Sequence, residues 1–196
     1  MSGIPQSLNE LIAEFSKLPG IGKKTAERLA VYLLQSSELE AVEFSKSILN
    51  VKKNISIDDI SHCFQENGEC INSLNHRDSH ILCIVKDPTE VFVIEKSGYN
   101  GHYHVLDGLI SPLKGIGPEN LNFDNLISVI NNYKEIIIAF DPTPEGDATT
   151  LYIIDLLKEY DVKITRLARG IPVGSSFDYI DEVTLTHSLE DRVEIK

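Results

Sequence analysis

The sequence predicts a protein of the mixed α+β or α/β class, in which a small helical module and a short connector precede an α/β domain with a mainly parallel sheet. Apolar residues repeat at helical spacing through about residues 7–54, the next stretch is polar, and short apolar runs alternate with helical patterns from residue 81. Strands that alternate with helices favour parallel pairing. We therefore expect segments at residues 1–55, 56–80, 81–175 and 176–196, the last contributing to oligomer contacts.

The helical module is predicted to contain three helices. The first begins near Ser7, and its apolar residues form one stripe made of Leu8, Leu11, Ile12 and Phe15. It stops near Pro19, because proline disfavours helical geometry at the preceding residue and the glycines that follow tolerate positive φ angles. Further helices are expected over residues 23–35 and 38–53.

The rest of the sequence alternates between strand and helix patterns. The run at residues 81–85 is apolar throughout, which suits a strand buried on both faces, with Cys83 as a small core residue. Further strands are expected at residues 102–106, 136–140 and 163–168, and helices at residues 91–95, 126–133 and 148–160. Residues 57–80 are expected to form an irregular connector, and residues 107–118 a loop rich in glycine and proline.

The bulk composition excludes several classes of protein. A chain of 196 residues forms one large domain or two small ones, and does not depend on disulfides or metals for its core. No uncharged apolar run is long enough for a transmembrane helix, and the first residues lack the features of a signal peptide. Three cysteines do not suit a secreted disulfide framework. We therefore expect a cytoplasmic protein with no membrane partner.

The formal net charge of −12 argues against nucleic acid as a partner, because the phosphate backbone repels an acidic protein. This objection holds unless the positive charge is concentrated in one place. Within residues 17–28 only Glu27 opposes a group of four cations, made of Lys17, Lys23, Lys24 and Arg28. This segment therefore has the local charge that binding to a polyanion requires.

Residues 18–28 are predicted to join two helices through a glycine turn. The N–H groups of Gly20 and Gly22, with the N-terminus of the following helix, can point at an anion. Lys23 and Lys24 place cations beside that anion. Such phosphate contacts position a duplex without reading its sequence. The alternative is an ordinary helical hairpin with a glycine cap and two solvated lysines.

Two cysteines in the connector, Cys63 and Cys70, are candidate zinc ligands. A structural zinc site needs four ligands, commonly two pairs of the form C-x-x-C. The positions three residues after each cysteine hold Glu66 and Ser73, and serine is a poor zinc ligand. We therefore favour a metal-free loop with two reduced thiols over a zinc site.

Acidic residues follow two of the predicted strands. Asp141, Glu145 and Asp147 emerge where ligand sites gather in open parallel sheets. Their oxygen atoms suit magnesium, and a second group, Asp87 and Glu90, follows an earlier strand and could face the first. The alternative is that part of the first group caps the helix that begins near Glu145.

The glycine turn resembles the helix-hairpin-helix motif of non-sequence-specific DNA-binding proteins. The resemblance rests on the string Leu18-Pro-Gly-Ile-Gly22 followed by Ala26. It implies contacts to the DNA backbone, made by Gly20, Gly22, Lys24 and Arg28.

The acidic segments resemble the Toprim domain of primases, topoisomerases and some nucleases, whose carboxylates hold metal. This sequence departs from the pattern of those enzymes, because Lys86 occupies the position of the first-strand glutamate and Thr143 that of the second aspartate. Two lost carboxylates argue against a two-metal catalytic site.

The order of these parts resembles the RecR family of recombination and repair proteins. Two later strings support the resemblance: Gly108-Leu-Ile-Ser-Pro-Leu-Lys-Gly-Ile-Gly-Pro118 and Ala168-Arg-Gly-Ile-Pro-Val-Gly174. The resemblance implies a ring-like homotetramer that encircles DNA and acts with RecO and RecF to load recombinase at gaps. It also implies that the acidic residues contact partners, chiefly RecO. Most members carry a four-cysteine zinc finger, of which this sequence keeps Cys63 and Cys70 in degenerate form.

The function predicted from the sequence is that of a DNA-repair mediator, a clamp or scaffold on double-stranded and gapped DNA in the bacterial cytoplasm and nucleoid. It is not expected to be an enzyme, and the sequence contains no GxxxxGK[ST] phosphate loop. The main alternative is a magnesium-dependent Toprim nuclease or primase-like enzyme. A third is a protein-interaction adaptor whose hairpin no longer binds DNA.

Overall fold

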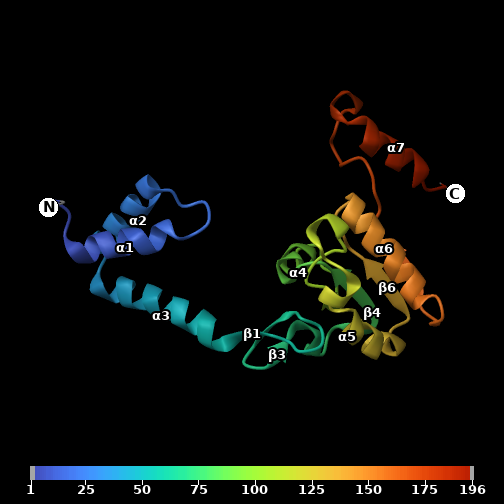
Figure 1. The fold of residues 1–196 in the computed structure, drawn as a ribbon, viewed down its shortest axis with the longest axis horizontal. Helices are drawn as coiled ribbons and strands as arrows, with labels where there is room; N and C mark the ends of the chain where they lie inside the picture. Colours follow the sequence, from blue (N-terminus) through green and yellow to red (C-terminus); the bar gives the residue numbers. More distant parts are fainter. Residues whose placement is uncertain (1–2, 195–196) are drawn as a thin grey trace. The chain divides into compact units, whose positions relative to one another are not determined.

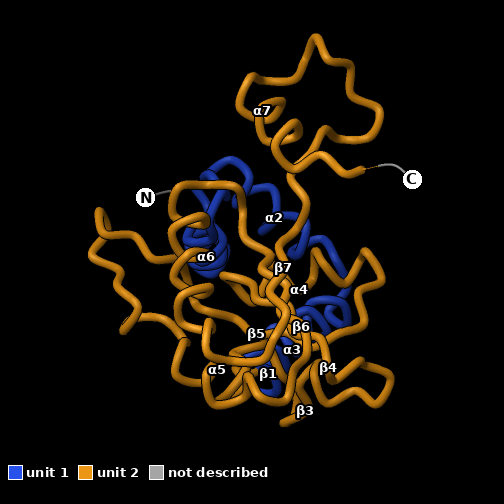
Figure 2. The backbone as a smooth tube through the Cα atoms, turned by 90° about the vertical axis from the view of Figure 1, so that its right-hand side faces the viewer, with its two compact units in different colours: residues 1–55 blue, residues 56–196 orange. Residues whose placement is uncertain are grey.

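The computed structural model describes residues 3–194 and divides into two compact units, Met1–Ile55 and Ser56–Lys196 (Figure 2). The first unit contains three helices: α1 (Gln6–Ser16), α2 (Lys23–Gln35) and α3 (Glu38–Asn54). They match the helices predicted from the apolar spacing to within one or two residues. None of the helices in residues 3–194 combines the length and hydropathy of a membrane span.

Helices α1 and α2 pack through a small core in which alanine lets the two backbones approach closely. Ile12, Ala26 and Ala30 are buried, and partly buried residues pack around them: Leu8, Leu11, Phe15 and Ile21. Helix α3 begins with a capping box, in which the Ser37 hydroxyl accepts from the Glu40 N–H and the Glu40 carboxylate accepts from the Ser37 N–H. None of its residues is buried.

The connector forms a small sheet, so the expectation of an irregular segment was wrong. Strands β1 (Ile55–Ile57), β2 (Phe64–Glu66) and β3 (Glu69–Cys70) lie in that order. Strands β2 and β3 pair antiparallel through a two-residue turn, in which Asn67 has φ 52° and Gly68 has φ 86°. Asn-Gly is the strongest short signal for such a hairpin, because both residues adopt the left-handed conformation readily. That signal was present in the sequence.

The second unit is built on a four-stranded parallel sheet, as predicted. Its strands are β4 (Asp78–Val85), β5 (Gly101–Val105), β6 (Glu135–Ile138) and β7 (Lys163–Arg166), in the order β5-β4-β6-β7. All three pairings are parallel. Strand β4 begins three residues before the apolar run that predicted it. Its first residues are polar and half-exposed or exposed, so an apolar pattern could not include them.

Helices lie on both sides of the sheet (Figure 1), and the alternating side chains of its strands enter two separate cores. On one face, Leu82 and Ile138 pack against helices α5 (Phe123–Val129) and α6 (Pro144–Leu157). On the other face, Cys83 and Val105 pack against helix α4 (Pro88–Glu95) and against the two cysteines of the small sheet. The cysteine module is therefore part of the second core.

Short turns of 3₁₀ helix complete the unit, at Ile71–Ser73, Pro112–Lys114, Pro118–Asn120, Ile130–Asn132 and Phe177–Tyr179. A final helix, α7 (Glu182–Glu190), occupies a segment for which the sequence analysis predicted no helix. Asp181 caps it by accepting a hydrogen bond from the Thr184 N–H at 2.9 Å.

A buried histidine makes the stability of the second unit depend on pH. His104 on β5 is 1% exposed, and its Nε2–H donates to the carbonyl oxygen of Asn122 at 2.8 Å. Burial lowers the pKa of His104 from 6.5 to about 4. The unfolded chain therefore binds more protons than the folded chain between these two values, and the stability present above pH 6.5 is lost as the pH falls.

We expect the free energy of unfolding to fall by about 2 kcal/mol from pH 7.5 to pH 5 through this residue alone. The measurement is urea denaturation at both pH values for the wild type and for His104→Gln, which keeps a side-chain N–H donor but does not titrate. The variant should lose less stability than the wild type over this range. Parallel losses in the two proteins would contradict the assignment.

Candidate nucleic-acid interface and acidic sheet edge

The turn between α1 and α2 is tight and leaves its backbone open. The Ile21 N–H donates to the Leu18 carbonyl at 3.1 Å, and Gly20 lies in the left-handed region at φ 76°. Gly22 is extended and is the N-cap of α2. A β-carbon placed at either glycine would have no heavy atom within 4 Å, so the space beside both is open. A ligand can therefore approach this backbone closely.

The N-terminus of α2 carries uncompensated positive partial charge. The first N–H groups of any helix lack partners within the helix, and together they attract anions. Here no side chain caps these groups, and the first turn of α2 contains no acidic residue. In α3 and α6, by contrast, glutamate or aspartate occupies the first turn. Helix α2 thus leaves its N-terminal N–H groups available to a phosphate.

The cations of this hairpin are exposed, and no ion pair within residues 3–194 involves Lys23, Lys24 or Arg28. Lys24 and Arg28 are four residues apart on α2 and so share one face of the helix. Lys17, the fourth cation of the predicted group, pairs instead with Glu14 at 2.7 Å.

The two units differ in charge. The first 55 residues contain seven lysines and arginines against six acidic residues, whereas the remaining residues contain 11 against 24. The net charge of −12 therefore lies in the second unit. An acidic total does not describe the surface around the hairpin.

The acidic edge of the sheet is organised around Lys86, which directly follows β4. Strands β4 and β6 are parallel neighbours, so their carboxyl ends place Lys86 and Asp141 at the same edge. The Lys86 ammonium pairs with the carboxylate of Asp141 and, at 3.0 Å, with Glu90 Oε1. The Lys86 N–H also donates to Glu90 Oε2 at 3.0 Å.

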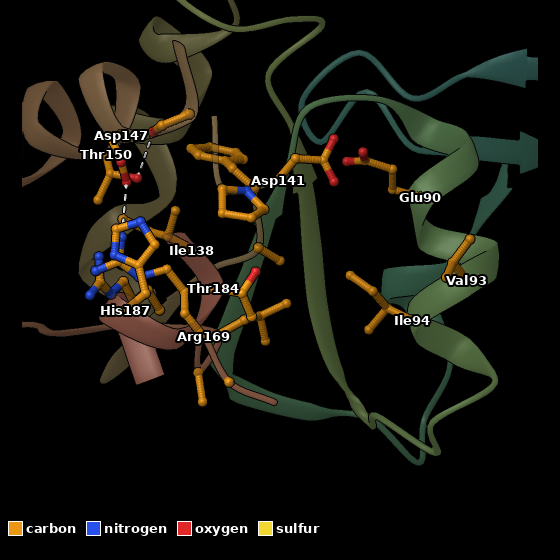
Figure 3. A pocket seen from close by; sticks show the side chains of 18 residues that line it. Glu90, Val93, Ile94, Ile138, Asp141, Asp147, Thr150, Arg169, Thr184 and His187 are labelled. Carbon is orange, nitrogen blue, oxygen red and sulfur yellow. Dashed lines mark hydrogen bonds and ion pairs between the residues drawn. The ribbon is translucent and has the colours of Figure 1, made fainter. Parts of the chain in front are cut away.

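Lys86 offsets part of the negative charge of the two carboxylates that flank it. In Figure 3 the carboxylates of Asp141 and Glu90 face one another. The hydrogen bond to Asp141 and then that to Glu90 raise the pKa of Lys86. The ammonium group thus stands where a metal ion between the two carboxylates would otherwise stand.

The remaining acidic residues of the predicted group serve the helices. Asp87 caps α4, accepting from the Thr89 N–H at 2.8 Å. The N-cap of α6 is Thr143, whose hydroxyl accepts from the Gly146 N–H at 3.1 Å. Glu145 and Asp147 lie in the first turn of α6, where negative charge is favourable.

The start of α6 is fixed by a close approach of two backbone segments. A side chain at Gly146 would come within 2.3 Å of the Asp141 carbonyl oxygen, so glycine lets the helix begin directly behind the strand end. The interpretation that an acidic residue of this group caps α6 was therefore wrong, because the N-cap is Thr143, and Glu145 and Asp147 lie in the first turn instead.

The residues present do not fit the metals that the resemblance implies. In the described part of the chain, residues 3–194, no group of three or more His, Cys, Asp or Glu side chains is placed to hold a metal ion. For zinc, Ser73 is engaged through its hydroxyl, which donates to the Cys70 carbonyl at 2.6 Å, and Glu66 is exposed. For magnesium, Lys86 holds the position between the carboxylates.

Next to the acidic edge lies a cavity of about 550 Å³ that includes residues the sequence analysis did not select. Helix α7 contributes Thr184 and His187 to its wall, and Arg169 faces it from the segment after β7 (Figure 3). Arg169 Nη1 lies 3.9 Å from Asp147 Oδ1, and its Nε donates to Asp191 at 3.0 Å. The signal available in the sequence was the position of Arg169 directly after the strand predicted at residues 163–168, where ligand sites gather in parallel sheets.

Three protein-family models match the chain in consecutive order. Residues 8–52 match a model described as RecR, helix-hairpin-helix; residues 80–168 match a Toprim domain; and residues 170–193 match a model described as RecR, C-terminal. The matched ranges contain the glycine hairpin, the acidic edge and helix α7 respectively. The chain therefore belongs to the RecR family, with the DNA-binding role in recombination and repair that its domains carry.

Proposed function

We propose that this protein is a non-sequence-specific DNA clamp and scaffold of recombinational repair, and that it performs no chemistry on DNA itself. The observation that carries the proposal is the hairpin at residues 20–28, where open N–H groups and exposed, unpaired cations lie together within an acidic protein. Backbone contacts of this kind bind any duplex, gapped or intact, and leave its bases unread. Such a role places the protein in the bacterial cytoplasm, at the nucleoid.

We further propose that copies of the chain associate into a ring, a tetramer by resemblance to the family. The first unit supports this with its exposed apolar residues, among them Tyr32, Leu34, Leu39, Leu49 and Val51. Large apolar side chains left exposed in this number are typical of a surface that contacts another protein. A ring would bring several hairpins around one opening, and so collect their positive charge.

The same proposal assigns the acidic edge to partner proteins rather than to catalysis. Two-metal phosphoryl chemistry needs carboxylates that are free to hold cations. At this edge Lys86 already pairs with Asp141 and Glu90, and Thr143 replaces a further carboxylate. The exposed charge that remains suits contact with RecO, and with RecF at the gaps where recombinase is loaded.

The DNA contact is tested by reversing two charges on α2. Lys24→Glu with Arg28→Glu should weaken binding to plain duplex by at least about tenfold. It should also reduce the slope of log affinity against log salt concentration by the amount expected for about two lost phosphate contacts. A mobility-shift titration at several salt concentrations measures both quantities. The matched control is Lys46→Glu with Lys52→Glu on α3, which changes the net charge equally. Unchanged affinity in the α2 variant would favour an adaptor that does not bind DNA.

The substitution at Lys86 is tested by restoring a carboxylate. In Lys86→Glu three carboxylates would lie together, and magnesium at about one hundred times its dissociation constant should raise the free energy of unfolding by about 2.7 kcal/mol. Thermal unfolding with and without magnesium measures the gain, with Lys86→Met as the control. An equal response in the wild type, or cleavage of DNA that Asp141→Ala abolishes, would instead support the nuclease alternative.

The partner contact is tested at Glu145, which lies in the first turn of α6. Reversing this charge in Glu145→Lys should raise the dissociation constant for purified RecO by about tenfold, on the order of a lost charge pair at a protein interface. Isothermal titration calorimetry measures it. Glu159→Lys, placed just beyond the other end of α6, makes the same change in net charge and should bind normally. Equal loss in both variants would argue against a local contact.

A further inference from the structure

Charged contacts tie helix α7 to the rest of the second unit. None of its nine residues is buried, and Val183 and Leu189 are exposed. Asp191, its C-cap, accepts hydrogen bonds from Arg166 Nη2 at 2.9 and 3.0 Å and from Arg169 Nε at 3.0 Å. Within residues 3–194, every ion pair between this helix or its cap and the rest of the unit involves Asp191. One residue therefore carries the charged attachment of the helix.

These ion pairs are accessible to salt and can open at low cost. The side chains of Asp191 and Arg166 are 24% and 40% exposed, and dissolved ions screen pairs with that exposure. Arg169 lies between two carboxylates, since its Nη1 is also 3.9 Å from Asp147 Oδ1 on α6. When Asp191 departs, Arg169 keeps Asp147 as a partner. Release of the helix therefore does not leave this arginine without a carboxylate.

Detachment of α7 should appear as a loss of helix. An isolated helix shorter than about 12–15 residues is marginal in water, even where its sequence favours the helical state. Helix α7 has nine residues, so its persistence depends on its attachment to the unit. Detachment and local unfolding are therefore coupled, and amide hydrogen exchange reports both.

Helix α7 also forms part of the wall of the cavity next to the acidic edge. Thr184 and His187 line this cavity of about 550 Å³, and Figure 3 shows Glu90 and Ile94 on the side opposite His187. Between these walls the lining is partly apolar and includes Ile138, which is only 2% exposed. The helix thus helps to cover an apolar surface that lies beside exposed carboxylates.

We propose that α7 is a lid on this cavity, held shut by the pairs of Asp191 with Arg166 and Arg169, and that its release admits a partner protein. The inference rests on the proposed function, in which the acidic edge contacts partners, and adds the regulation of that contact. The partner that fits presents a large apolar side chain to the lining of the cavity and a cation to Asp147. An apolar anchor in a pocket, with charges at its rim, is the arrangement that dominates binding at protein interfaces.

The first test measures hydrogen exchange of the α7 amides by mass spectrometry in the full chain, at about 50 mM and about 500 mM salt. Asp191→Asn removes the charge but keeps the shape, so exchange at residues 182–190 in low salt should be at least about fivefold faster than in the wild type. High salt should speed exchange in the wild type and change the variant little. The control Glu190→Gln removes the same charge from a carboxylate that pairs with His187 inside the helix. Equal exchange in the two variants, or wild-type exchange that does not respond to salt, would overturn the lid.

A cysteine placed in the cavity tests access without any partner. Thr150 lines the cavity from α6 and is half-buried, so the alkylation rate of Thr150→Cys depends on what covers it. Adding Asp191→Asn should raise this rate about fivefold, whereas adding Glu190→Gln should not. Peptide mass mapping separates this thiol from the native cysteines, which are buried. A rate that Asp191→Asn leaves unchanged would show that α7 does not cover the cavity.

Binding of purified RecO tests the consequence for the partner. A partner that needs the open form binds with an affinity reduced by the fraction of protein that is open, so Asp191→Asn should lower the dissociation constant by about fivefold. Equal dissociation constants in the wild type and the variant would overturn the role of the lid in partner access. If neither protein binds RecO, the proposed partner contact is wrong, and hydrogen exchange and alkylation alone decide whether α7 is a lid.

Discussion

A strand at the centre of a parallel sheet must bury side chains on both faces, and β4 fulfils this condition with alternate residues. Leu82 and Ile84 enter the core under α5 and α6, while Cys83 and Val85 enter the core shared with α4 and the cysteine module. Because β4 pairs with both β5 and β6, its position fixes where the neighbouring strands end. Strand β4 therefore positions two features: the acidic edge lies at its carboxyl end, and the cysteine module packs against one of its faces.

The hairpin and the sheet edge differ in whether their charged groups have partners within the chain. The hairpin keeps its cations unpaired and its helix N-terminus uncapped, which costs local stability, because a capped helix is more stable than an uncapped one. The sheet edge follows the opposite pattern, with Lys86 and Arg169 each pairing with carboxylates. The unpaired cations of the hairpin are the groups from which the proposed DNA contact was argued, whereas the charged groups of the sheet edge already have partners within the chain.

Much of the fold could be predicted from local sequence, because the signals were local. Apolar spacing gave helices α1 to α3, and the run at residues 81–85 gave the buried central strand. The hairpin at Asn67 and Gly68 was not predicted although its signal is equally local, because the strands on either side of the turn are only two or three residues long and mostly polar. Helix α7 carries mixed polar and apolar residues without a clear stripe, and periodicity could not identify it.

The candidate sites were predictable as residues but not as contacts. Lys86 and Thr143 could be recognised as departures from the Toprim pattern in the sequence alone. That Lys86 bridges Asp141 and Glu90 depends on which strands are neighbours, and that is a property of the sheet. Arg169 was not predicted as a site residue, and its partner Asp191 lies 22 residues further along the chain, beyond the reach of a local pattern.

The lysine at the sheet edge also frees this surface from the supply of divalent ions. A bound metal ion can dissociate, be replaced by other ions or be removed by chelators. The ammonium group of Lys86 is covalently part of the chain and cannot be lost in these ways. The shape and charge of the edge therefore do not depend on the concentration of magnesium. If the edge serves partner proteins as proposed above, they meet the same surface at every magnesium concentration.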